Sequence, residues 1–160
     1  MNAEHLEQLK KRHRYDEWSG GTEGQGSGAS QVLRVPEDLL PQWRLHHADV
    51  LRQEGLPPMT QSIWTRGKDE ALSVEIWECA STAAARELLL TLLGEFESPL
   101  VERITGPGSV GDVSFGQGEH MLLFARGNVV VQVRNAGREL VPVADPAREI
   151  DARLTRPTER

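Results

Sequence analysis

Three β-rich runs follow one another in the C-terminal half of the chain with no helical run between them. They are VGDVSFG at 110–116, HMLLFARG at 120–127 and NVVVQVRNAG at 128–137. The polar QGE segment and the corner formed by Gly127 and Asn128 are too short to carry a crossover between parallel strands, so the runs form an antiparallel meander. In the last run one face is continuously valine and the other is mixed, which predicts a strand in the core of a sheet.

A second β-rich pair lies earlier in the chain. TQSIWTR at 60–66 and ALSVEIWEC at 71–79 are separated by the polar turn GKDE, which is typical of a hairpin. In the second of these strands Leu72, Val74 and Ile76 share one face. Ser73, Glu75 and Trp77 share the other face. The period of two therefore places the aliphatic face in the core.

Two segments have helical periodicity. STAAARELLLTLLGEF at 81–96 has Ser81 as a plausible N-cap and Gly94 as a stop signal. Its apolar stripe consists of Ala85, Leu88, Leu89, Leu92 and Phe96, and it predicts a helix that covers the sheet. DPAREIDARL at 145–154 predicts a closing helix with Asp145 as N-cap and Pro146 at the first helical position.

The N-terminal third is less regular. Residues 3–15 predict a short helix with only Leu6 and Leu9 on its apolar side. Five glycines between residues 19 and 30 indicate a flexible linker. Residues 32–35 predict a short strand ended by a proline. Residues 43–52 alternate without a clean apolar side, which favours a strand and leaves a helix open.

These elements predict an α+β fold, an antiparallel sheet of five to six strands with two main helices packed on it. The short N-terminal helix would stand on a Gly-rich linker. The expected organisation is a helical appendage at 1–18, a linker at 19–30, one domain at 31–156 and a tail at 157–160. Because two leucines bury little surface compared with the entropy of ordering a dozen residues, residues 1–30 are expected to be dispensable for folding.

Composition excludes several classes of function. The chain has 160 residues and a formal net charge of -6, with a pI near 5.4. Binding to nucleic acid or to an anionic membrane surface requires clustered positive charges, so this acidic balance argues against both kinds of partner. A single cysteine allows no internal disulfide and no thiolate zinc cluster. No metal or other cofactor is expected. The charged N-terminus and the lack of a long apolar run favour a cytoplasmic location, and the preference for arginine over lysine favours a bacterial source.

Three motifs are candidates for chemistry. Cys79 precedes a helix N-terminus, where a thiol pKa can fall, but no histidine spacing supplies it with a base. His47 and Asp49 share one side of an extended strand and form a possible acid and base pair. GPGSVG at 106–111 has the letters of a dinucleotide fingerprint. A strand rather than a helix follows it, so a glycine-rich turn is the better interpretation.

Four apolar residues are candidates for binding. Trp64 and Trp77 lie on neighbouring strands of the hairpin, and the sequence places them together on the face opposite the aliphatic one. That face is either a second core layer or an exposed platform. Leu90 and Leu93 widen the stripe of the 81–96 helix beyond what one sheet needs to cover it. They predict a protein partner or self-association, including a homodimer.

From about residue 33 to residue 154 the chain resembles small bacterial α+β sensor or lipoprotein domains of the PsbP-like kind. SVEIWECASTAAARELL, SVGDVSFG and LLFARGNVVVQV carry the likeness. The resemblance implies a ligand-binding or accessory module without catalytic residues. Domains of this kind are often exported, whereas the charged N-terminus of this chain does not resemble a signal peptide, so an exported role is not expected.

The sequence therefore favours a non-enzymatic bacterial module that acts through protein or small-ligand contacts. The alternative is a small α+β enzyme with a pocket on its sheet, using Cys79 as nucleophile or His47 with Asp49 as acid and base.

Overall fold

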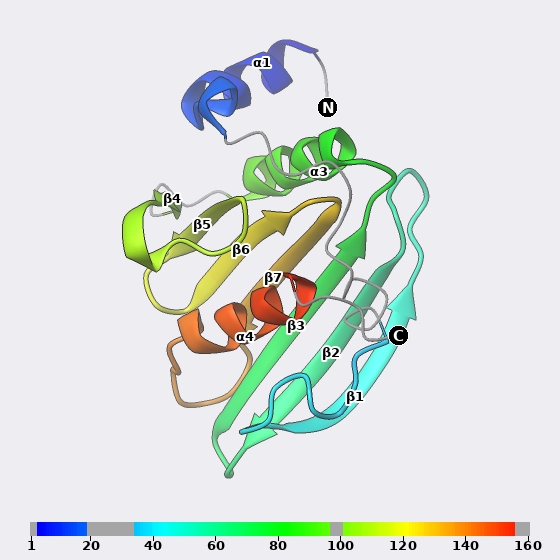
Figure 1. The fold of residues 1–160 in the computed structure, drawn as a ribbon, viewed down its shortest axis with the longest axis vertical. Helices are drawn as coiled ribbons and strands as arrows, with labels where there is room; N and C mark the ends of the chain where they lie inside the picture. Colours follow the sequence, from blue (N-terminus) through cyan, green and yellow to red (C-terminus); the bar gives the residue numbers. More distant parts are fainter. Residues whose placement is uncertain (1–2, 19–33, 97–100, 156–160) are drawn as a thin grey trace.

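A seven-stranded antiparallel sheet forms the centre of the protein (Figure 1). The computed structural model describes residues 3–18, 34–96 and 101–155. The strands are β1 (Arg44–Leu51), β2 (Met59–Arg66), β3 (Glu70–Glu78), β4 (Val101–Ile104), β5 (Val113–Gln117), β6 (Met121–Arg126) and β7 (Val129–Asn135). Their order across the sheet is β1-β2-β3-β7-β6-β5-β4. The β1-β2-β3 meander thus meets the β4-β5-β6-β7 meander where β3 pairs with β7.

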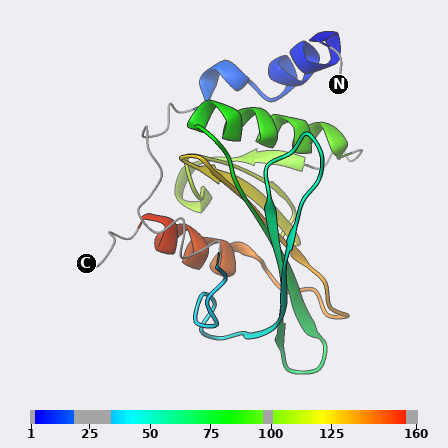
Figure 2. The same cartoon turned by 90° about the vertical axis from the view of Figure 1, so that its right-hand side faces the viewer.

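Helices cover both faces of this sheet (Figure 2). Within the described residues they are α1 (Ala3–Arg12), α3 (Thr82–Glu95) and α4 (Ala144–Thr155), with 3₁₀ turns η1 (Tyr15–Glu17) and η2 (Gly106–Gly108). Ser81 is the N-cap of α3, since its hydroxyl accepts a hydrogen bond from the amide of Ala84 at 3.0 Å. None of these helices combines the length and the apolar character that crossing a bilayer requires.

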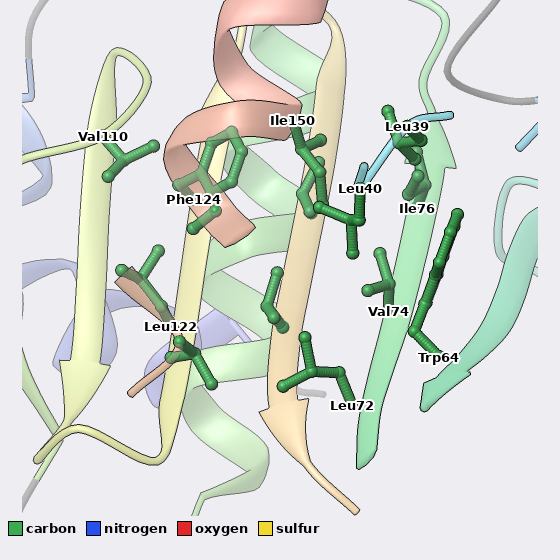
Figure 3. Packing of buried hydrophobic residues seen from close by; sticks show 14 of the residues in the cluster. Leu39, Leu40, Trp64, Leu72, Val74, Ile76, Val110, Leu122, Phe124 and Ile150 are labelled. Carbon is green, nitrogen blue, oxygen red and sulfur yellow. The ribbon is translucent and has the colours of Figure 1, made fainter. Parts of the chain in front are cut away.

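Two hydrophobic cores lie back to back on the sheet. The first, under α4, contains Leu72, Val74 and Ile76 together with Ile150 (Figure 3). The second core, under α3, contains Trp77, Leu123 and Val130, which alternate along β3, β6 and β7 with residues of the first core. Because β3, β6 and β7 send successive side chains into opposite cores, each of these three strands contributes apolar residues to both cores. The all-valine run that opens β7 follows from this arrangement.

The α+β fold is confirmed, but several element boundaries are wrong in the prediction. The sheet has a seventh strand, β4, which the sequence did not reveal because VERI is only four residues long and pairs on one side with β5. The strand favoured for residues 43–52 is confirmed as β1, which spans Arg44–Leu51. The strand predicted at 32–35 is not present in its described part, where Val35 has a φ of 51°. Helix α4 begins at Ala144, so Asp145 lies in its first turn and is not its N-cap.

The two hairpin tryptophans lie on opposite faces, which corrects the prediction that they share one. Trp64 is opposite Leu72, and Trp77 is opposite Met59. Opposed residues of an antiparallel pair share a face, so Trp64 belongs to the α4 core and Trp77 to the α3 core. The cause is the turn: β2 ends at Arg66 and β3 begins at Glu70, and a loop of different parity would have moved Trp64 to the other face.

Helix α1 and turn η1 pack on the second core. Leu9 and Trp18 are each 5% exposed and lie in the same cluster as the leucines of α3. The Trp18 ring lies 5.5 Å from that of Phe115 on β5. This packing argues against a free appendage. The predicted linker at 19–30 and tail at 157–160 lie outside the described residues.

Candidate functional site

A cavity of about 340 Å³ opens on the α3 side of the sheet, beside the C-terminal end of that helix. Strands β2, β3 and β7 form its floor, and α3 forms one wall. The lining residues are Gln53, Leu56, Met59, Glu75, Trp77, Leu92, Glu95, Phe96, Gln132 and Arg134. They combine an apolar wall with a small group of converging polar side chains, which is the usual composition of a small-molecule site.

An ion pair lies on the floor of this cavity. The Arg134 guanidinium on β7 donates a hydrogen bond to Oε1 of Glu75 on β3 at 2.7 Å. Glu75 is only 9% exposed, whereas the Arg134 side chain is 49% exposed. Gln132 stands directly opposite Glu75 in the β3–β7 ladder and is also buried. The sheet thus places a nearly buried carboxylate, a primary amide and a half-exposed guanidinium within one cavity.

This polar group is costly for folding. Desolvating a carboxylate is unfavourable, and apolar residues of similar volume often stabilise a protein as well as or better than a buried ion pair. The rest of the α3 face shows that such residues fit, because Trp77 and Val130 occupy the next positions of the same strands. Polar residues here are therefore explained better by binding than by stability.

The apolar wall comes from three elements. Trp77 on β3 is 5% exposed and lies in the second core, and Met59 stands opposite it on β2. Leu92 and Phe96 approach from the end of α3 and pack against the same core. A ring or aliphatic chain that entered the cavity would contact this wall and reach the polar floor with its other end.

Cross-strand register extends the polar face to the edge of the sheet. Asp49 pairs with Gln61, and Gln61 pairs with Glu75. His47 and Asp49 therefore face the same side as the cavity, two strand spacings or about 10 Å from its floor. A β-bulge between Leu45 and His47 turns Leu45 to the other side, so the strict alternation predicted for residues 43–52 fails at that point.

The predicted acid and base pair is formed, but it stands alone. His47 Nε2 lies 2.5 Å from Oδ2 of Asp49, and both side chains are 56% exposed. Neither residue borders the cavity.

Cys79 has the opposite environment to that of an activated thiol. Burial, and secondarily the Glu78 carboxylate, raise the pKa of its thiol to about 11. Its backbone is fixed by Asn128, whose carbonyl accepts from the Cys79 amide and whose side-chain amide donates to the Cys79 carbonyl. It borders a second cavity of about 690 Å³, on the other side of the sheet, where Val50 and two prolines form a mostly apolar lining.

All four predicted binding residues, Trp64, Trp77, Leu90 and Leu93, are buried in the two cores. Leu90 and Trp64 are fully buried, and Leu93 is 3% exposed. The extra width of the α3 stripe is used within the chain, because α1 packs beside α3 in the second core. The two leucines thus offer no exposed surface for a partner, and only Trp77 borders the candidate cavity.

Sequence reasoning did not identify Glu75, Gln132 and Arg134 as a site. The signal was present in part, since period two placed each of them on the mixed face of its strand. The sequence does not show that β3 pairs with β7, because the two strands are separated by 50 residues of chain. This pairing brings the polar residues of the two strands together on one face of the sheet.

GPGSVG forms η2 and the approach to β5, as the glycine-rich turn interpretation predicts. Gly111 has a φ of 67°, and a Cβ there would lie 2.5 Å from the Ala125 carbonyl oxygen. Its amide donates to Asp151 of α4, which also binds Arg126. The loop therefore connects α4 to the end of β6.

Comparison of the chain with protein-family models, with curated proteins and with solved structures found no match. Within the described ranges no group of three or more histidine, cysteine, aspartate or glutamate side chains has the geometry to hold a metal ion. The case for a function therefore rests on the cavity and its side chains.

Proposed function

We propose that this protein is a non-enzymatic binding module that holds a small amphipathic molecule in the cavity between β2, β3, β7 and the end of α3. One observation carries the proposal: the nearly buried Glu75 is paired with the half-exposed Arg134 on the floor of a cavity walled by Trp77 and Phe96. A floor of this kind costs stability in the empty protein, and a ligand that uses it would offset that cost.

The side chains define the class of ligand. The apolar wall fits an aromatic ring or a short aliphatic chain. The Arg134 guanidinium supplies donors for a carbonyl or carboxylate oxygen, and the Glu75 carboxylate and the Gln132 carbonyl supply acceptors. A single head group that both accepts and donates, such as a primary amide, matches this floor more completely than a carboxylate alone.

The enzymatic alternative receives less support from the geometry. A nucleophile needs a lowered pKa or a base within hydrogen-bond reach. The pKa of Cys79 is raised, and the His47–Asp49 pair is exposed to solvent and does not line the candidate cavity. Binding without covalent chemistry accounts for the cavity and requires neither group.

A fragment screen by NMR tests this proposal. Single-ring fragments with amide, carboxylate or amine head groups are titrated into the ¹⁵N-labelled full chain. We expect amide fragments to shift the indole N–H signal of Trp77 and the side-chain amide of Gln132, with dissociation constants of about 1 mM, the range for small fragments.

Variants establish where the fragments bind. Arg134→Gln should weaken amide binding by about tenfold, because a hydrogen bond to a charged group is lost. Arg148→Gln is the matched control, since Arg148 is similarly exposed at 51% and lies on α4. Fragments that leave Trp77 and Gln132 unshifted, or that bind both variants equally, would show that this cavity is not the binding site.

A further inference from the structure

A third cavity, of about 430 Å³, lies at the other edge of the same sheet face and is lined by residues of α1, η1, β4 and β5. Arg103 on β4 stands opposite Phe115 on β5, and Phe115 belongs to the same cross-strand row as Glu75. Along this row Arg103 stands four strand spacings, about 19 Å, from Glu75. The two cavities share no lining residue.

Three guanidinium groups border this cavity, from Arg12, Arg14 and Arg103. The carboxylates of Glu17 and Glu102 also border it, which leaves one net positive charge in a chain whose net charge is -6. Glu17 lies 3.9 Å from Arg14, and both side chains are mostly exposed. Within the part of the chain that the structure describes, neither Arg12 nor Arg103 has a carboxylate within ion-pair distance.

The turn that presents these groups is strained and held in place. Arg14 has φ and ψ of 52°, the left-handed conformation that non-glycine residues rarely adopt. The Trp18 indole N–H donates to the carbonyl of His13 at 2.8 Å, and the Trp18 ring packs on Phe115. Strained residues held by their surroundings concentrate at ligand sites.

His13 adds a polar group to the cavity wall. Its ring makes an edge contact with Phe115 at 5.5 Å, and burial together with the neighbouring Arg12 lowers its pKa. Its Nε2 is buried and has no hydrogen-bond partner within the described part of the chain. An unpaired buried imidazole nitrogen is unfavourable, and a small rotation of the ring toward a bound oxygen atom would relieve it.

We propose that this cavity binds the phosphate group of a small molecule. Phosphate oxygens match the planar fork of arginine, and more than one guanidinium is needed to balance a charge near -2. The cavity is larger than a phosphate group, which leaves room for an organic body beside Val101 and Thr105.

Titration of the full chain with inorganic phosphate tests the proposal, with glycerol 1-phosphate and citrate as further probes. Potassium chloride keeps the ionic strength constant. Backbone amide signals of Arg14, Arg103 and Thr105 should shift and saturate, with a dissociation constant of about 1 mM or below. Glycerol 1-phosphate should bind at least as tightly as inorganic phosphate. Tighter binding of citrate would overturn the assignment to phosphate.

The controls separate a built site from general attraction. Arg12→Gln and Arg103→Gln should each weaken phosphate binding by about tenfold. Lys11→Gln removes the same charge from an exposed position next to Arg12 that does not border the cavity, and it should change the affinity by less than about twofold. Equal weakening by all three variants, or no saturable binding, would overturn the proposal.

Discussion

Burial sets the chemistry of the Cys79 thiol, whose pKa is about 11 instead of its ordinary value near 9. Alkylation requires the thiolate, so the rate of reaction of the native protein with iodoacetamide should still be rising at pH 10 and be half-maximal near pH 11. Denatured protein supplies the comparison, and its rate should be half-maximal near pH 9. A native rate that is already half-maximal near pH 9 would mean that the thiol is accessible and would restore Cys79 as a candidate nucleophile.

The same pKa has a consequence for stability. The folded state holds the thiol proton more tightly than the unfolded state does, so the contribution of Cys79 is complete below about pH 9 and is lost as the pH rises towards 11. Urea unfolding at pH 8 and pH 10.5 should show this loss in the native chain. Cys79→Ala should show a smaller decrease between the two values of pH, whereas equal decreases would assign the effect to other groups.

The Glu75–Arg134 pair is a residue-scale compromise between stability and binding. Replacing both with leucine removes a desolvated carboxylate and extends the apolar face already formed by Trp77. The double variant should be as stable as the native protein or about 1 to 2 kcal/mol more stable in urea unfolding, and it should lose fragment binding. A double variant that is destabilised by a similar amount would assign the pair a structural role.

At the scale of elements, α1 and η1 are part of the second core. Leu9→Ala and Trp18→Ala should each cost about 2 to 4 kcal/mol, because both side chains are buried. For a chain of this length each kcal/mol corresponds to about 2 to 4 °C in Tm. Thermal unfolding checks this, with Lys11→Ala on the exposed side of α1 as control. Changes as small as in the control would support the free appendage that the sequence predicts.

The local sequence pattern predicted which segments form helices and strands. It did not predict which face each side chain occupies or which strands pair. The hairpin, the meander and the Ser81 cap are visible as periods and turn residues, and each is present. The face of Trp64 depended on one residue of turn length, and the face of His47 on a bulge. The burial of Leu90 depended on where α1 docks. The candidate site was less predictable still, because Glu75 and Arg134 meet only through a long-range strand pairing.

On the scale of the whole molecule, the two cores share the strands between them. Trp43 and Trp64 lie in the α4 core, and Trp18 and Trp77 lie in the α3 core. Because β3, β6 and β7 contribute residues to both cores, unfolding of these strands disrupts both cores together. The domain should therefore unfold in one step. A double variant with Trp18→Phe and Trp77→Phe leaves fluorescence from the first core only.

The complementary variant, Trp43→Phe with Trp64→Phe, leaves fluorescence from the second core. Each variant is unfolded in urea and followed both by tryptophan fluorescence and by far-ultraviolet circular dichroism, so that every midpoint is compared within one protein. We expect the two midpoints to coincide in both variants, since the β3–β7 pairing joins the halves of the sheet. An earlier fluorescence midpoint in the second variant alone would mean that α1 and η1 detach before the sheet unfolds.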